Sequence, residues 1–335
     1  MDQPTNPHER IMQLAYGYQP ACVVGTAAEL DLFTHLGDGE LTADELARAV
    51  GADARATAML ADAVAALGLL EKRDGRYSVP EEFRPLLCAD GPQTVVPMLQ
   101  HLMNVIRAWA MLGWTVKAGT PAPRTPSTRG PAADRAAFIA AMHSVSGPMA
   151  DQLVAKLGPL RFERLLDVGG ASGTWTIALL RAVPGARATI FDLPDAITQA
   201  RDRFAGHELA ERVDFAPGDF YRDPLPGGAD FAWVSAIIHQ HSRRHNRELF
   251  AKVFTALRPG GRVAVRDVVM DPDRTSPRMG AMFAINMLAN TQSGGTFTFE
   301  EIAEDLSGAG FVEPELAVKA EDMNSVVTAR KPGDS

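Results

Sequence analysis

The sequence predicts an α/β fold, in which a doubly wound, mostly parallel, seven-stranded sheet follows an all-helical winged-helix domain. From residue 160 onward, short apolar runs alternate with helical patterns, which is typical of strand–helix–strand units. Before residue 118, helical spacing of apolar residues prevails. We therefore expect a small domain over 1–117, a linker and connecting helix over 118–157, and the sheet domain over 158–335.

The first domain has the element order of a winged helix. Thr42 and Glu45 form a capping-box pair at the start of one helix, and the next helix presents apolar residues on one side. A turn at Asp74-Gly75 then joins two short strands into a hairpin, the wing. The helices of this domain are expected over 11–36, 42–51, 54–68 and 95–117.

Winged helices often bind DNA, but the charges of this one argue against it. Residues 41–87 hold six basic and eight acidic side chains, and the helix that would enter a DNA groove carries Arg55 as its only cation. Phosphate binding needs several cations on one face. We therefore expect an interaction or dimerisation module, with a DNA-binding regulator as the alternative.

A proline-rich segment and a helix connect the two domains. Residues 118–131 contain four prolines and no acidic residue, which predicts a linker, or alternatively a lid over a site. A helix over 132–157 leads into the sheet domain. Its strands are expected at 165–168, 188–191, 213–216, 231–236, 262–269, 312–319 and 323–330. Its helices are expected near 173–183, 194–205, 243–257 and 299–309. A short turn joins the last two strands, which must therefore be antiparallel.

Composition argues against several classes of protein. The chain of 335 residues is 46% hydrophobic, enough for a buried core, and its net charge of −8 opposes a general affinity for nucleic acid or anionic membrane. No apolar run approaches the roughly 20 residues of a membrane span, and the polar start lacks a signal-peptide pattern. The two cysteines have no metal-type spacing and indicate a reducing compartment. We expect a cytoplasmic protein with no metal, membrane or nucleic-acid partner.

The most informative run is Leu-Leu-Asp-Val-Gly-Gly-Ala-Ser-Gly at 165–173. An apolar strand ends in Asp167 and bends through glycines, so the backbone can approach a ligand closely. A dinucleotide fingerprint would need glycine at 171 and 174, where alanine and threonine stand, and no P-loop Gly-Lys-Ser/Thr follows. Asp192, 19 residues beyond Gly173, ends the next strand, where an acidic group can hold a ribose. Because no cation stands near the glycines, the pattern favours a nucleoside cofactor with a cationic or zwitterionic tail. A tight turn without ligand is the alternative.

These features together resemble the S-adenosylmethionine-dependent small-molecule O-methyltransferases of the plant caffeate and bacterial polyketide-tailoring type. The likeness covers nearly the whole chain, and the winged helix is similar to that family's dimerisation domain. The matching motifs are Asp-Val-Gly-Gly-Ala-Ser-Gly at 167–173, Phe-Asp-Leu-Pro at 191–194, Gly-Asp-Phe at 218–220, Ile-Ile-His-Gln at 237–240 and Leu-Arg-Pro-Gly-Gly-Arg at 257–262. The resemblance implies a Rossmann-like fold, S-adenosylmethionine as methyl donor, S-adenosylhomocysteine as product, a small-molecule acceptor and a homodimer formed through the N-terminal domain.

The resemblance also implies a cofactor site. Asp192 would accept hydrogen bonds from the ribose hydroxyls, and Asp219 and Phe220 would flank the adenine. Ser235 would contact the cofactor at the end of the fourth strand, and the glycine loop would line its methionine part. The implied cofactor-binding residues are Asp167, Gly169, Gly170, Gly173, Asp192, Leu193, Asp219, Phe220 and Ser235.

His239 matches the family's general base, and Asp267 would hold the second nitrogen of its imidazole. The acceptor oxygen must lose a proton as it attacks the methyl group. Reference pKa values of phenol and imidazolium differ by about 3.5, so complete prior deprotonation would cost roughly 5 kcal/mol. An oxyanion about 4 Å from a sulfonium recovers roughly 4 kcal/mol at an effective dielectric of 20. A neutral histidine beside the cofactor can therefore suffice.

Two positions depart from the family pattern. Gln240 stands where an acidic residue usually follows the base, and Thr296 stands where an acidic group usually follows the glycines. Weaker support of the base leaves open methylation of nitrogen, sulfur or carbon, or non-methylating chemistry in the same pocket. A metal held by His239 and His241 is a further alternative, but no third ligand is evident, so we expect no metal.

The acceptor pocket is predicted by position in the family. Its implied residues are Met142, His143, Met282, Asn286 and Met287. Methionine adapts to flat aromatic ligands, and a buried amide such as that of Asn286 needs a polar partner. For Met287, ordinary core packing is an equal interpretation. We expect a small, aromatic hydroxyl compound as the acceptor.

Overall fold

The computed structural model describes residues 6–170 and 172–333, the side chains of 143–148 excepted. The chain divides into two compact units. One comprises Met1–Ala110 and Pro123–Val145, and the other comprises Met111–Ala122 and Ser146–Ser335. The long helix α9 (Pro131–Lys156) therefore contributes to both units. The domain boundaries expected at 117 and 157 stay a prediction.

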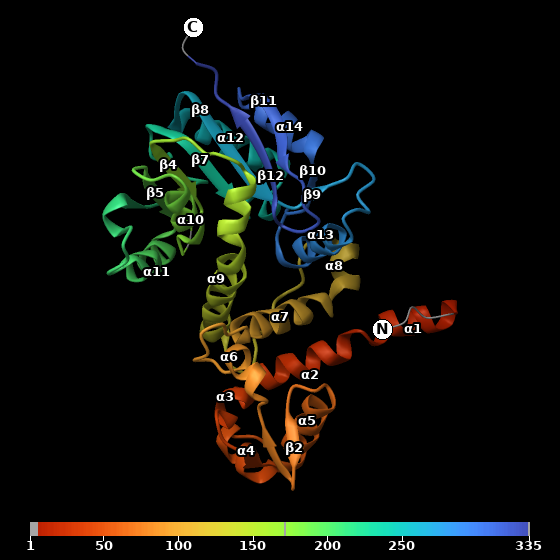
Figure 1. Ribbon diagram of the computed structural model, residues 1–335. Helices are drawn as coiled ribbons and strands as arrows, with labels where there is room; N and C mark the ends of the chain where they lie inside the picture. Colours follow the sequence, from red (N-terminus) through yellow and green to blue (C-terminus); the bar gives the residue numbers. More distant parts are fainter. Residues whose placement is uncertain (1–5, 171, 334–335) are drawn as a thin grey trace. The chain divides into compact units, whose positions relative to one another are not determined.

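The first unit is mainly helical (Figure 1). Its helices, besides the first part of α9, are α1 (Pro7–Tyr16), α2 (Tyr18–Glu29), α3 (Leu32–Leu36), α4 (Ala43–Val50), α5 (Ala54–Ala66), η1 (Glu81–Phe83), α6 (Arg84–Leu87) and α7 (Val96–Trp109). The predicted capping box is present, because the Glu45 amide donates to Thr42 Oγ1 and the Thr42 amide donates to Glu45.

A small antiparallel sheet accompanies these helices, in the order β1-β3-β2. Strands β2 (Glu71–Arg73) and β3 (Arg76–Ser78) form the predicted hairpin. Strand β1 (Leu41–Thr42) pairs with β3, a contact that the sequence did not reveal. The domain expected to be all-helical therefore also holds a three-stranded sheet.

The second unit is built on a seven-stranded sheet in the order β11-β12-β8-β7-β4-β5-β6. Six of its strands run in one direction, and β12 alone among these seven is antiparallel, to both β8 and β11. The strands are β4 (Arg164–Val168), β5 (Arg187–Asp192), β6 (Val213–Pro217), β7 (Ala229–Ser235), β8 (Leu257–Asp267), β11 (Val312–Val318) and β12 (Ser325–Arg330). The predicted fold class and all seven predicted strands are confirmed.

Helices cover both faces of this sheet (Figure 1). The second half of α9, α10 (Thr174–Ala182) and α11 (Pro194–Phe204) pack on one face, and α12 (Arg243–Ala256) and α14 (Phe299–Gly308) pack on the other. Alternate strand residues enter the two cores, so that Trp233 faces the first group of helices and Val234 the second. The remaining elements are α8 (Leu112–Ala118), η2 (Ala210–Arg212), η3 (Ile238–Gln240), β9 (Val269–Met270), α13 (Arg278–Asn290) and β10 (Phe297–Thr298).

The strand order places a switch point beside β4. From β4 the sheet extends through β5 and β6 on one side and through β7 and β8 on the other. Open α/β sheets bind ligands at the carboxyl ends of their strands at such a point. The glycine loop follows β4 and His239 follows β7, so both lie at this edge. Within the described part of the chain, no helix is both long and apolar enough to cross a bilayer.

Candidate active site

The loop from β4 to α10 has a conformation that requires glycine. Gly169 and Gly173 have φ angles of +69° and +72°, which residues with a side chain rarely adopt. The Gly173 amide donates to the Gly170 carbonyl at 2.8 Å, and Gly173 is the N-cap residue of α10. A Cβ atom added at Gly170 would lie 2.8 Å from the Asp167 side chain. The loop therefore packs closely onto Asp167 and leads directly into a helix N-terminus.

Asp167 is a buried carboxylate that is only half satisfied. Thr176 Oγ1 donates to its Oδ2 at 2.6 Å, whereas no described residue forms a hydrogen bond with its Oδ1. Burial, helped by the nearby charge of Asp192, raises the pKa of Asp167 to about 7. A buried acceptor without a donor is costly, so this oxygen suits a cationic donor such as an ammonium group.

Arg203 of α11 also holds the glycine loop. Its Nη1 atom donates to the Ser172 carbonyl at 2.9 Å and to the Thr174 hydroxyl at 2.7 Å. The expectation that no cation stands near the glycines is therefore wrong. Arg203 is distant from the glycines in the sequence, but α11 places it beside the loop. Both of these acceptors are neutral groups of the loop region, which indicates a role in fixing the loop.

The next two strands place carboxylates at the same edge. Asp192 ends β5 and pairs with Pro217 of β6, and Asp219 follows shortly after. The Leu193 amide donates to Asp192 Oδ1 at 2.7 Å, and the Tyr221 amide donates to Asp219 Oδ1 at 2.9 Å. Both carboxylates are half-buried, as is Phe220, while Leu193 is exposed. The cofactor-binding residues predicted on β4, β5 and β6 thus share one edge of three adjacent strands.

His239 and Asp267 form a buried pair at the ends of β7 and β8. The His239 Nδ1 atom lies 2.9 Å from both carboxylate oxygens of Asp267. Asp267 also accepts from the His239 amide at 3.3 Å and from the Val268 amide at 2.8 Å. The two side chains are 6% and 1% exposed. Because a carboxylate can only accept, Nδ1 must be the donor, which leaves the lone pair on Nε2 as the basic site.

Aromatic and glycine residues enclose this pair. The Phe283 ring of α13 meets the His239 ring edge-on at a centroid distance of 4.8 Å, and the Gly295 amide donates to the His239 carbonyl at 2.9 Å. A Cβ atom at Gly294 would lie 2.4 Å from that same carbonyl. Phe283 was not among the predicted site residues, although its position on one helix with Met282 and Asn286 was a usable signal.

The two positions that depart from the family pattern each take part in a hydrogen bond to a backbone carbonyl. The exposed Gln240 side chain donates to the Ala236 carbonyl at 3.1 Å. The Thr296 carbonyl accepts from Arg274 at 3.2 Å, and the residue is buried. Asp267 is therefore the acidic partner that His239 has among the described residues.

His241 lies beside Phe220, which is predicted to flank the adenine. Its ring is hydrogen bonded to the Tyr221 hydroxyl and meets the Phe220 ring edge-on at 5.6 Å. Burial, together with the neighbouring histidines, lowers the pKa of His241 to about 4, so the ring is neutral near pH 7. Among the described residues, no three histidine, cysteine or acidic side chains come together as a metal site would need.

Ser235 and Arg266 lie on the face of the sheet that α10 covers. Ser235 ends β7, is 9% exposed, and accepts a hydrogen bond from Arg266 Nη1 at 3.1 Å. Arg266 is 3% exposed and was not among the predicted site residues.

The predicted acceptor residues fall into two groups. On α13, Met282 is exposed, Met287 is buried in the manner of a core residue, and Asn286 accepts from Asn290 at 2.9 Å. Met142 belongs to the other unit and is 41% exposed. The side chain of His143 lies outside the described residues.

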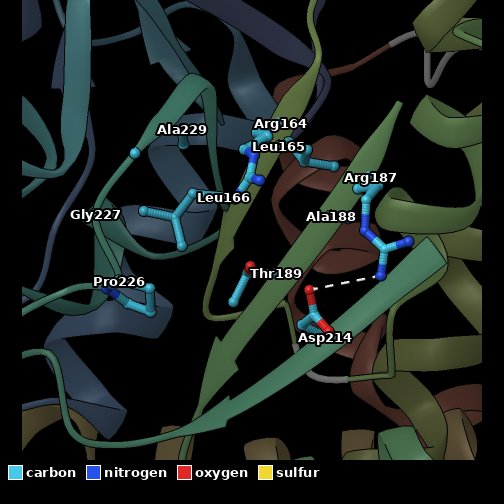
Figure 2. Close-up of a pocket in the computed structure, with 11 residues that line it drawn as sticks. Arg164, Leu165, Leu166, Arg187, Ala188, Thr189, Asp214, Pro226, Gly227 and Ala229 are labelled. Carbon is cyan, nitrogen blue, oxygen red and sulfur yellow. Dashed lines mark ion pairs between the residues drawn. The ribbon is translucent and has the colours of Figure 1, made fainter. Parts of the chain in front are cut away.

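A separate hollow lies at the opposite edge of the sheet. Figure 2 shows it lined by residues at the amino ends of the strands, among them Arg164, Arg187 and Asp214. Arg187 and Asp214 form an ion pair of 3.9 Å there. Because open α/β sheets bind ligands at the carboxyl ends of their strands, this hollow does not bear on the site described above.

The chain matches two family models. Residues 121–312 match the O-methyltransferase domain, and residues 12–82 match the O-methyltransferase dimerisation domain.

Individual relatives extend over nearly the full length. The tetracenomycin polyketide synthesis 8-O-methyl transferase of Streptomyces glaucescens is 33% identical, with 96% of each chain covered. The 3-hydroxy-5-methyl-1-naphthoate 3-O-methyltransferase of Streptomyces sahachiroi is 32% identical, with 90% of this chain and 89% of the relative covered. The crystal structure of human N-acetylserotonin methyltransferase in complex with S-adenosylmethionine superposes with a TM-score of 0.83 at 26% identity, covering 99% and 100% of the two chains. The chain therefore belongs to the S-adenosylmethionine-dependent O-methyltransferase family.

Proposed function

We propose that the acceptor is a small aromatic hydroxyl compound and that His239 is the general base for its methylation. The observation that carries this proposal is the buried His239–Asp267 pair at the switch-point edge, with Nδ1 turned to the carboxylate. The relative from Streptomyces sahachiroi is named for methyl transfer to the 3-hydroxyl of a naphthoate. The edge of Phe283 beside His239 suits a flat ring.

The cofactor-binding residues fit S-adenosylmethionine, which supplies a methyl group on a sulfonium. Asp192 stands at the end of β5, where it can accept from ribose hydroxyls. The unpaired Oδ1 of Asp167 can accept from the α-ammonium group. Phe220 and His241 supply aromatic edges on the adenine side.

His239 acts on the acceptor rather than on the cofactor. Asp267 fixes the tautomer in which Nε2 carries a lone pair, and this atom takes the hydroxyl proton as the oxygen attacks. The resulting imidazolium is stabilised by the same carboxylate at 2.9 Å. Asp267 is thus a positioning residue that acts through His239.

Acceptor screening with methyl-labelled S-adenosylmethionine tests this proposal. Hydroxylated naphthoates, anthraquinones and simple phenols form the panel, and NMR locates the label in the product. Label on a phenolic oxygen is the expected result. Label on nitrogen, sulfur or carbon would contradict the O-methylation of an aromatic hydroxyl. Salt-dependent DNA binding in a parallel titration would favour the regulator alternative.

We also propose a cytoplasmic homodimer. The match to the dimerisation domain at 12–82 supports self-association through the N-terminal domain. Both Cys22 and Cys88 are free thiols, as is usual in a reducing compartment.

A further inference from the structure

We propose that Arg266 binds the α-carboxylate of the cofactor's amino-acid tail. Together with Asp167, which would bind the α-ammonium group, Arg266 would recognise the zwitterionic form of that tail. The inference rests on the proposed cofactor site and names a binding residue within it. It concerns recognition of the cofactor, not the chemistry at His239.

The strand register brings Arg266 close to the glycine loop. Arg266 pairs with Ser235 across β8 and β7, and Val234 pairs with Val168 across β7 and β4. The end of β7 at Ser235 is therefore next to the start of the loop at Gly169. Since Arg266 Nη1 donates to Ser235 Oγ at 3.1 Å, one small side chain separates the guanidinium from that end of the loop.

The charge of Arg266 is buried without an acidic partner. Its Nε and Nη2 atoms donate to Asn324 Oδ1 at 3.0 and 2.8 Å, and its guanidinium carbon lies 4.4 Å from the centre of the Trp175 ring. No carboxylate of a described residue lies within ion-pair distance. Burial lowers the pKa of Arg266 to about 10, although the more distant charges of Asp267 and Asp322 act to raise it, so the guanidinium is charged at neutral pH. A cation that is 3% exposed among neutral partners is costly until an anion joins it.

The guanidinium retains donors for such an anion. An arginine has five N–H groups, and the hydrogen bonds to Ser235 and Asn324 use three. The two that remain are one on each terminal nitrogen, an arrangement that suits the two oxygens of a carboxylate. Trp175 beneath the guanidinium belongs to the first turn of α10, and the positive end of a helix dipole also favours an anion.

The complementary charge lies on the same face of the sheet. Asp167 pairs with Trp233, which shares its face with Ser235 and Arg266 by strand alternation. The unpaired Oδ1 of Asp167 and the guanidinium of Arg266 thus offer an acceptor for an ammonium group and donors for a carboxylate. An α-amino acid tail carries both groups on one carbon.

Calorimetry with three nucleosides tests this assignment on the intact protein. S-adenosylhomocysteine carries the whole tail, 5′-deoxy-5′-(3-aminopropylthio)adenosine lacks only the carboxylate, and 5′-methylthioadenosine lacks both charged groups. Arg266→Met should lower the affinity for S-adenosylhomocysteine at least 30-fold and the affinities for the other two nucleosides less than threefold. Arg262→Met is the matched control, since Arg262 is an exposed arginine of the same strand, and it should leave all three unchanged.

The outcomes separate a binding role from a structural one. Equal weakening of all three ligands by Arg266→Met, or no weakening, would overturn the assignment. If that variant does not fold, Arg266→Lys keeps the charge but loses the planar fork, and it should weaken S-adenosylhomocysteine alone, about tenfold. If Arg266→Lys left the affinity for S-adenosylhomocysteine unchanged, or lowered the affinities for all three nucleosides equally, that result would contradict the proposal. Failure of the wild-type protein to bind any of the three would instead contradict the proposed cofactor site.

Discussion

Three ionisable side chains at the carboxyl edge of the sheet are buried in different ways. Asp267 shares its charge with His239 and two backbone amides, so it is satisfied within the chain. Asp167 has one hydroxyl donor and one unpaired oxygen, and Arg266 has neutral partners and an aromatic ring. The charged groups around the proposed base therefore have their partners within the chain. Asp167 and Arg266, at the proposed cofactor site, are only partly satisfied within it, as expected where a charged ligand binds.

Replacing His239 tests the base directly. His239→Ala should lower kcat at least a hundredfold, because general-base catalysis of this kind contributes about 10²–10⁴-fold. Calorimetry should give an unchanged affinity for S-adenosylhomocysteine, since the imidazole does not hold the cofactor. Turnover near the wild-type rate would remove His239 from the mechanism.

Replacing Asp267 tests the positioning of that base. Asp267→Asn should lower kcat roughly tenfold to a hundredfold, because an amide can present its NH₂ group to Nδ1 and favour the wrong tautomer. Affinity for S-adenosylhomocysteine should change less than twofold, and Asp267→Glu should restore part of the lost kcat. An Asp267→Asn enzyme with normal kcat would show that the pair is structural.

The pKa of Asp167, raised to about 7 by burial, predicts two opposite pH effects. Its folded-state pKa exceeds the unfolded value, so its contribution to stability is present below about pH 4 and is lost as pH rises through 7. Binding of the cofactor's ammonium group needs the ionised form, so affinity for S-adenosylhomocysteine should rise about tenfold per pH unit up to 7 and then level off.

Asp167→Asn should abolish both trends. Denaturant unfolding from pH 5 to 8 and calorimetry over the same range measure the difference between the two proteins. An identical pH dependence of binding in both would show that Asp167 does not meet the cofactor as an anion.

At the scale of elements, the β4–α10 loop combines two constraints. Gly173 needs a left-handed backbone, and its position next to α11 leaves no room, since an added Cβ atom would lie 2.5 Å from the Phe204 ring. Gly185 has a φ of +89°, but open space surrounds its Cβ position. Substitution at Gly185 therefore measures backbone strain alone, whereas substitution at Gly173 measures strain together with steric crowding.

Gly173→Ala should lower the free energy of unfolding by about 1–3 kcal/mol more than Gly185→Ala does. The extra loss comes from the displaced Phe204 ring. Denaturant titrations of the two variants measure this difference. Equal losses of unfolding free energy would show that the loop accommodates the added methyl group without destabilisation.

At the scale of the whole molecule, helix α1 exposes its apolar side chains. None of its residues is buried, and Ile11 and Leu14 are 64% and 66% exposed. Tyr16 and Tyr18, where α1 meets α2, are also more than half exposed. Apolar side chains exposed together in this way indicate an interaction surface, which agrees with the match to a dimerisation domain.

Sedimentation equilibrium should therefore give twice the chain mass of 36.0 kDa at micromolar concentration. Ile11→Asp with Leu14→Asp should raise the dimer dissociation constant at least a hundredfold. Met59→Asp, on an equally exposed methionine of α5, should have little effect. A monomeric wild-type protein, or an unaffected double variant, would contradict the dimer proposal.

The sequence by itself determined the alternation of strands and helices, the glycine loop and the acidic strand ends, because hydrophobic period and glycine backbone freedom are properties of residues close together in the chain. The tertiary structure decided which side chains meet across the sheet. Arg203 reaches the loop from α11, Phe283 meets His239 from α13, and Arg266 stands beside Ser235. Such contacts depend on strand order and register, which join residues 28 or more positions apart and leave no local pattern in the sequence.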